Sequence, residues 1–132
     1  MTTFLVATNS VHTSATLCDY LADRMRADDT VHALNSQVGG DETTAEMIRD
    51  GEDALNTVWS RLGGRTTVET HQFVRGNEPA KDILAFATEH DVDEIVIGVR
   101  KRRPTGKLLF GSVAQRILLT ADRPIAVIPR ES

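Results

Sequence analysis

Several features that mark other classes of protein are scarce in this sequence of 132 residues. Cys18 is its one cysteine, so no internal disulfide can form, which suits a reducing cytoplasm. No apolar run approaches the roughly 18 residues that a membrane-spanning helix needs. The short apolar run that begins at Phe4 follows no basic segment, unlike a secretory signal. These absences predict a cytoplasmic protein with no membrane segment.

An excess of positive charge is missing as well. The net charge of −4 argues against a general nucleic-acid coat, which is normally basic, so nucleic acid is not the expected partner. Linkers, low-complexity segments and internal repeats are also missing, and we expect residues 1–132 to fold as one domain. Basic side chains nevertheless gather in one short stretch, where they raise the local positive potential: Arg100, Lys101, Arg102, Arg103 and Lys107.

Apolar runs typical of buried strands alternate with segments of helical periodicity along the chain. Strands are expected at residues 4–7, 31–34, 66–74, 95–97 and 125–128, and helices at residues 14–26, 41–62, from 78 and from 111. This alternation predicts an α/β fold, a doubly wound parallel sheet of five strands with helices on both faces, of the Rossmann-like type. The ligand crevice of such a sheet lies at the carboxyl ends of the strands, where the winding direction reverses. If the first and fourth strands are neighbours, the loops that follow them line one crevice.

Local signals suggest where the helices begin and which faces they bury. Thr13 or Ser14 is the expected N-cap of the first helix, since a hydroxyl can accept a hydrogen bond from a free backbone N–H. The helix at residues 41–62 should bury an apolar face that includes Met47 and Trp59. Both side chains are therefore expected to pack in the core.

An anion-binding pattern follows the fourth predicted strand. Gly98 comes directly after that strand, and Gly111-Ser112 opens the next helix. A helix N-terminus offers unpaired N–H groups and a positive dipole end, and glycine lets the backbone approach a phosphate closely. Arg100 and Lys101 lie between these two points. The combination predicts an anion site, whereas the simpler alternative is a turn, a helix cap and a solvated basic loop.

Three segments near the C-terminus are similar to a known family. They are Ile95-Val96-Ile97-Gly98, the run from Leu108 to Ala114, and the run from Asp122 to Pro129. With the order of the predicted elements, they resemble the C-terminal third of a universal stress protein. Residues 75–80 also resemble the exit of that family's third strand. The resemblance implies the family's fold over nearly the whole chain.

Two positions depart from the pattern of family members that bind ATP. Those members carry G-x2-G-x9-G-[S/T], and this sequence keeps the spacing but has Lys101 at the middle glycine. A lysine restricts the backbone there, yet it also brings a cation. Asn9 stands where the family usually has an aspartate that meets the ribose, and its amide oxygen can still accept a hydrogen bond. The ligand implied is ATP or another adenine nucleotide, with or without Mg²⁺, while a free anion or an empty site stays open.

The resemblance also assigns roles to single residues. It implies that Ala33 lies at the adenine edge, that Ile97 lies at the hinge of the site, and that Ser112 and Val113 bind phosphates. No catalytic residue or metal ligand is assigned, because the four histidines lack ligand-like spacing. Cys18 is expected in the core. The candidate nucleotide- or phosphate-binding residues are Ala7, Thr8, Asn9, Ala33, Ile97, Gly98, Arg100, Lys101, Gly111, Ser112 and Val113.

These observations lead to one main functional hypothesis and two alternatives. The main one is a cytoplasmic stress-response module that binds a nucleotide or phosphate-type anion between the loops after strands one and four. It would act through conformation and protein partners. The alternatives are an interaction module that has lost ATP binding through its Lys101 and Asn9 departures, and a slow Mg²⁺-dependent ATPase. The resemblance further implies a homodimer joined through the last strand, which contains Ile125, Ala126, Val127 and Ile128.

Overall fold

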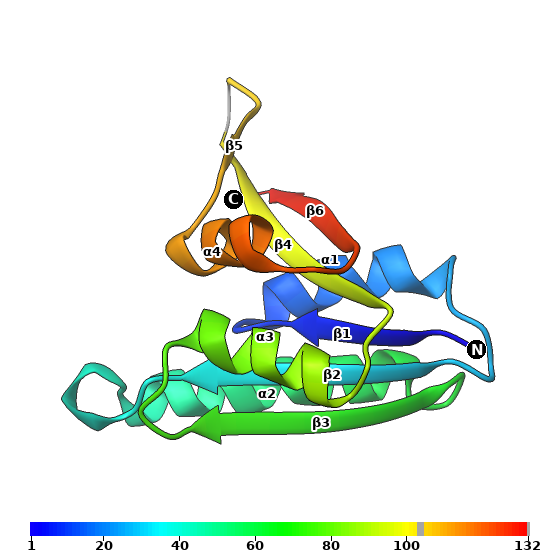
Figure 1. Cartoon of the computed structure of the whole chain (residues 1–132), viewed down its shortest axis with the longest axis horizontal. Helices are drawn as coiled ribbons and strands as arrows, with labels where there is room; N and C mark the ends of the chain where they lie inside the picture. Colours follow the sequence, from blue (N-terminus) through cyan, green and yellow to red (C-terminus); the bar gives the residue numbers. More distant parts are fainter. Residues whose placement is uncertain (103–104, 132) are drawn as a thin grey trace.

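The computed structural model describes residues 1–102 and 105–131, so Arg103 of the predicted basic loop lies outside the described residues. The described chain forms a mostly parallel sheet flanked by four α-helices (Figure 1). The strands are β1 (Thr3–Ala7), β2 (Thr30–Gln37), β3 (Thr67–Val74), β4 (Glu94–Arg102), β5 (Lys107–Leu109) and β6 (Ile125–Glu131). The helices are α1 (Val11–Ala22), the short 3-10 helix η1 (Gly40–Glu42), α2 (Ala45–Leu62), α3 (Pro79–Glu89) and α4 (Ser112–Thr120).

The winding direction of the sheet reverses between β1 and β4. Strand β1 pairs in parallel with both β2 and β4, and Val6 lies level with Ala33 on one side and Val96 on the other. From β1 the chain winds outward to β2 and β3, whereas β4 lies on the opposite side and carries β6. The predicted α/β fold, with strands one and four as neighbours, is therefore confirmed.

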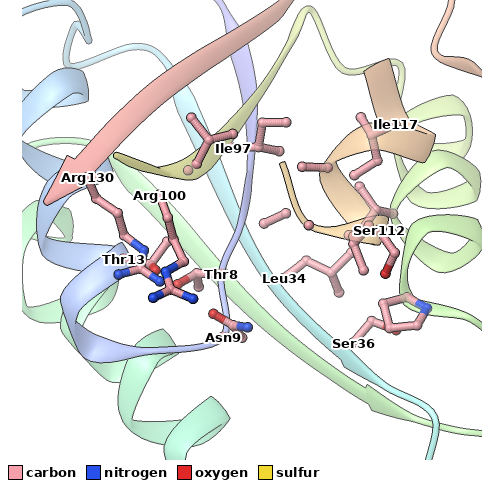
Figure 2. Close-up of a pocket in the computed structure, with 18 of the residues that line it drawn as sticks. Thr8, Asn9, Thr13, Leu34, Ser36, Ile97, Arg100, Ser112, Ile117 and Arg130 are labelled. Carbon is pink, nitrogen blue, oxygen red and sulfur yellow. The ribbon is translucent and has the colours of Figure 1, made fainter. Parts of the chain in front are cut away.

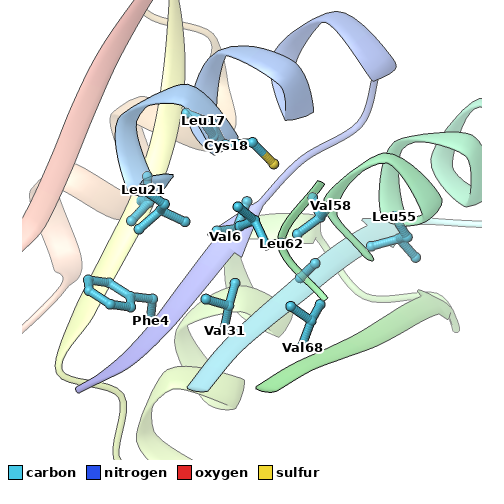
Figure 3. Close-up of a cluster of buried hydrophobic side chains, with 12 residues drawn as sticks. Phe4, Val6, Leu17, Cys18, Leu21, Val31, Leu55, Val58, Leu62 and Val68 are labelled. Atoms are coloured by element: carbon cyan, nitrogen blue, oxygen red, sulfur yellow. The ribbon is translucent and has the colours of Figure 1, made fainter. Parts of the chain in front are cut away.

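Each face of the sheet is covered by two helices and has its own apolar core. Helices α1 and α2 cover one face, and α3 and α4 cover the other (Figure 1). Side chains alternate along β2, so Val31 and Ala33 enter the first core while Leu34 enters the second. Figure 3 shows the first core, where Phe4 and Val6 of β1 pack beneath α1 and α2. Cys18 belongs to this core, which confirms its predicted place.

Some local predictions about the helices are wrong. Helix α1 begins at Val11, and its N-cap is Ser10, whose hydroxyl accepts a hydrogen bond from the backbone N–H of Thr13 at 3.1 Å. Met47 and Trp59 of α2 are 44% and 54% exposed rather than buried. They are not among the buried residues of α2, so the prediction from periodicity made the buried face of this helix too wide.

Strand β4 is the largest difference from the predicted elements. It continues for four residues beyond Gly98, which therefore lies within the strand, level with Ile128 of β6, and is not a strand exit. Its last three residues, all basic, pair in antiparallel fashion with β5, a strand that the sequence did not predict. Backbone pairing on both edges holds this polar segment extended, whereas hydrophobic patterning detects only its apolar half.

Strand β6 forms one edge of the sheet. Within the described residues it pairs with β4 alone, and β5 pairs with the opposite edge of β4 beyond the end of β1. Pro129 is accommodated inside β6, where an edge strand tolerates the missing N–H. Ile125 to Ile128 thus lie on an open edge, and their predicted part in a homodimer stays a prediction. In the described part of the chain, each helix is too short or too polar to cross a bilayer.

Candidate functional site

A cavity of about 350 Å³ opens at the carboxyl ends of β1 and β4, where the winding reverses. Its walls come from both faces of the sheet, since Ile83 of α3 lines it together with Thr13 of α1 and Ile117 of α4, which Figure 2 labels. Small-molecule sites commonly occupy about 300–1,000 Å³ at such a position. The fold therefore provides a ligand-sized cavity at the crevice that the sequence predicts.

Most of the predicted site residues meet in this cavity. The predicted residues that line it are Ala7, Thr8, Asn9, Ile97, Gly98, Arg100, Gly111, Ser112 and Val113. The two others lie elsewhere. The side chain of Ala33 is fully buried in the core under α1 and α2, and Lys101 does not line the cavity. Because neighbouring residues of a strand face opposite ways, Arg100 faces the cavity and Lys101 does not.

Among the lining residues that were not predicted from the sequence, the polar side chains of Ser36 and Arg130 were missed because the predicted strands were too short. Ser36 lies near the end of β2, which was expected to stop at Leu34, and Arg130 lies in β6, which was expected to stop at Ile128. A longer strand with the same alternation would have indicated both positions. Leu34, Ile83, Ile97 and other apolar side chains complete the wall. An apolar wall with a few polar groups is typical of a ligand pocket.

A buried amide fixes the backbone at the mouth of β1. Asn35 is 1% exposed, and its Nδ2 donates to the carbonyl oxygen of Thr8 at 3.0 Å. Its Oδ1 accepts hydrogen bonds from Gln37 Nε2 at 2.9 Å and from Gln72 Nε2 at 3.1 Å. The hydroxyl of Thr8 also lies 2.8 Å from that of Ser14. Thr8 is thus held from both sides while it lines the cavity.

A buried carboxylate positions the opposite wall. Asp82 in the first turn of α3 is buried, and its Oδ2 accepts a hydrogen bond from the hydroxyl of Ser36 at 2.7 Å. Its Oδ1 accepts from Asn77 Nδ2 at 3.0 Å and lies 3.5 Å from Arg75 Nη2. Ser36 is therefore anchored to the segment between β3 and α3, and Asp82 is a supporting residue that the sequence did not reveal.

The charge that lines the cavity is entirely positive. Among the described residues, its charged lining side chains are Arg100 and Arg130, and no carboxylate joins them. A second hollow, also of about 350 Å³, adjoins the first and shares Asn9, Ser36 and Pro79 with it. The second hollow contains acidic side chains, so the pair of hollows is cationic at one end and acidic at the other.

Three of the four histidines, which are far apart in sequence, come together under α3. His32 Nδ1 lies 3.2 Å from His71 Nε2, and the ring of His90 stacks on Phe86 with centroids 3.8 Å apart. The ring centroid of His90 is 5.2 Å from that of His32. Within the described ranges, no group of three or more histidine, cysteine, aspartate or glutamate side chains is arranged to hold a metal ion. Strand register and the crossing of α3 create this cluster, which residue spacing does not reveal.

This histidine cluster predicts a loss of stability in mild acid. Burial lowers the pKa of His32 and His71 below their usual 6.5, with Glu69 opposing the shift and His90 adding to it. Below about pH 6.5 the unfolded chain therefore binds more protons than the folded chain. As the pH is lowered, the free energy of unfolding falls until the pH is below the lowered pKa values of the folded protein. We expect urea denaturation midpoints to drop over this window. The drop should be smaller in His71→Gln than in the wild type. His12→Gln, on the exposed face of α1, is the control and should behave like the wild type. If the urea midpoint of His71→Gln changes with pH as much as that of His12→Gln, the assignment is contradicted.

The sequence model of the universal stress protein family matches residues 1–129. The chain belongs to this family. A universal stress protein of Mycolicibacterium smegmatis is 32% identical over 109 residues, which cover 82% of each chain. The structure of a universal stress protein from Archaeoglobus fulgidus has a TM-score of 0.75 at 32% identity and covers 97% of this chain and 98% of its own. A structure of the Archaeoglobus fulgidus universal stress protein in complex with dAMP has a TM-score of 0.69 at 26% identity, with the same coverage.

Family membership agrees with the fold, since the two Archaeoglobus fulgidus structures each cover 97% of this chain. The matched segment includes the whole of the cavity except Arg130, which lies one residue beyond its end. Arg130 is therefore the one lining residue about which the family match says nothing.

Proposed function

We propose that this universal stress protein binds an adenine nucleotide in the cavity between β1 and β4 and acts through the resulting conformation and its protein partners. One observation supports the proposal above all. Nine of the eleven residues that the sequence singled out line a single cavity of ligand size, and its charged lining is positive. The Archaeoglobus fulgidus relative in complex with dAMP adds support for this class of ligand.

The start of α4 is suited to a phosphate group. Gly111 is the N-cap, and apart from its chain neighbours no atom of the described residues lies within 4 Å of the position where its Cβ would be, so a ligand has open access to the backbone. The first turn of α4 contains no acidic residue, which leaves its N–H groups and dipole available to an anion. Ser112 and Val113 line the cavity at this point. In this proposal a phosphate binds here, and any Mg²⁺ arrives with the phosphates because the lining residues described include no carboxylate.

Lys101 replaces the middle glycine of the family's ATP-binding pattern, and its position in the structure gives less reason to exclude nucleotide binding than the sequence does. Its side chain does not line the cavity, whereas a blocking residue would have to do so. The β4–β5 hairpin does reach the cavity through Arg100 and Leu109, while its described side chains outside the cavity, such as Arg102 and Lys107, are exposed. A nucleotide that contacts Arg100 and Leu109 would therefore change the surface that a partner meets. The interaction module that has lost ATP binding is the alternative, and an empty protein would favour it.

The direct test is to identify what the purified protein binds. We expect denaturation of the purified protein to release an adenine nucleotide, which mass spectrometry identifies. In thermal unfolding, saturating nucleotide at 100 times Kd should raise the Tm by roughly 10 °C. Gly111→Val should abolish the shift, because it adds bulk where the backbone meets the ligand. Gly64→Val is the matched control, since its Cβ position is equally open but distant from the cavity. A protein indifferent to AMP, dAMP, ADP and ATP would refute the proposal.

A further inference from the structure

Two arginines from neighbouring strands point into the same end of the cavity. Arg100 of β4 and Arg130 of β6 are register partners, so their side chains leave the sheet on the same face. Both line the cavity. Figure 2 shows their guanidinium groups gathered beside Thr8 and Thr13, which also line it. The structure thus brings two permanent positive charges to one point from residues 30 positions apart.

The described side chains place no carboxylate in the cavity with this arginine pair. Among the side chains of residues 1–102 and 105–130, none forms a hydrogen bond or ion pair with either guanidinium. Two like charges side by side repel each other. A guanidinium presents a planar fork of donors that matches phosphate oxygens. A phosphate between the two arginines would therefore remove an unfavourable interaction and form charge-assisted hydrogen bonds.

The arginine pair lies apart from the phosphate position at α4. In Figure 2, Ser112 is on the opposite side of the cavity from Arg100 and Arg130, with Ile97 and Leu34 between them. A ligand with a single phosphate can engage one of the two ends. A ligand with two or three linked phosphates has a chain of anionic groups that can engage both.

We propose that Arg100 and Arg130 form a second anion subsite, which binds the terminal phosphate of a nucleoside diphosphate or triphosphate. The subsite makes the protein selective for nucleotides with more than one phosphate over monophosphates. This inference rests on the proposed function, because it assumes that a nucleotide occupies the cavity. It goes beyond the dAMP complex of the relative, whose ligand has one phosphate.

Calorimetric titration at fixed ionic strength tests this subsite. Adenosine, AMP, ADP, ATP and tripolyphosphate are titrated into the wild type and into Arg130→Gln and Arg100→Gln. We expect the wild type to bind ATP roughly 10- to 100-fold more tightly than AMP, the effect of one or two charge-assisted hydrogen bonds. Each glutamine variant should lose most of this preference, because its affinity for ATP should fall much more than its affinity for AMP. Arg130→Lys should retain part of it, since lysine keeps the charge but not the fork.

Arg102→Gln is the matched control for general electrostatics. Arg102 is an exposed residue of the same strand, but it does not line the cavity. Equal losses in Arg102→Gln and Arg130→Gln would overturn the subsite, as would a wild type that binds AMP and ATP equally. That second result would leave the proposed function intact. Binding of tripolyphosphate that depends on Arg130, with no binding of any nucleotide, would instead refute the proposed function and retain the anion subsite. Without ligand, Arg100→Gln and Arg130→Gln should melt no lower than the wild type, because each removes one of two like charges that repel. A lower Tm would indicate misfolding.

Discussion

Replacing Gly51 by alanine is expected to destabilise the protein by about 2–4 kcal/mol, through overpacking and a disrupted buried hydrogen bond. Gly51 lies in α2 with its Cα against the sheet, and it is buried. A Cβ at this position would lie 2.1 Å from Asn35 Oδ1 and 2.8 Å from Gln72 Nε2. Neither amide can retreat freely, because Asn35 holds Thr8 and Gln72 also donates to the carbonyl of Ile48 at 2.9 Å. The close approach of α2 to the sheet therefore requires glycine.

Intrinsic helix propensity predicts the opposite sign. Alanine is favoured over glycine in a helix interior by about 1 kcal/mol, so an unobstructed Gly51→Ala would stabilise α2. Urea denaturation of the wild type and the variant decides between the two effects. Asn56→Ala, at an exposed position of the same helix, is the control and should change stability by less than about 0.5 kcal/mol. A Gly51→Ala variant as stable as the wild type would show that the amides rearrange at little cost.

The sequence predicted the features that depend on local hydrophobic patterning. Runs such as Ile95 to Ile97 indicated buried parallel strands, and their alternation with helices indicated a doubly wound sheet, in which β1 and β4 are indeed neighbours. The reversal in turn predicted the position of the crevice, and Thr8, Gly98 and Ser112 do meet there. Patterning therefore gave the fold class and the approximate position of the candidate site.

What could not be predicted depends on pairing between distant strands. Strand β4 remains extended beyond Gly98 because β5 and β6 pair with its two edges, and no local signal distinguishes this segment from a basic loop. The register of β6 on β4 aligns Arg130 with Arg100. The pairing of β3 with β2 brings His71 within hydrogen-bonding distance of His32. Ala33 was assigned to the site by resemblance alone, and its side chain is buried in the core under α1 and α2. In each case the deciding contact joins residues that are far apart in the chain.

The hydrogen bonds of Asn35 lead to a second prediction of a large effect on stability. It is measured as the coupling between Asn35→Ala and Gly51→Ala. Asn35→Ala removes the donor to the Thr8 carbonyl and should cost about 2 kcal/mol, the penalty for a buried polar group left unpaired. It also removes the oxygen that an alanine at position 51 would strike. Gly51→Ala should therefore cost far less in the Asn35→Ala background. We expect the double variant to be more stable than the sum of the single effects by about 1–3 kcal/mol.

A double-mutant cycle by urea denaturation measures this coupling, and Gly51→Ala combined with Asn56→Ala provides the additive reference. Additivity within about 0.5 kcal/mol in the Asn35 cycle would mean that the strain at Gly51 arises from another contact. Nucleotide titration of the same variants separates packing from function. Asn35 fixes the carbonyl of Thr8, a residue that lines the cavity, so Asn35→Ala should weaken nucleotide binding in both backgrounds. A double variant that is more stable than the sum of the single effects but still binds nucleotide weakly would show that Asn35 has two separable roles. It limits the size of the residue at position 51, and it orients the carbonyl of Thr8 at the end of β1.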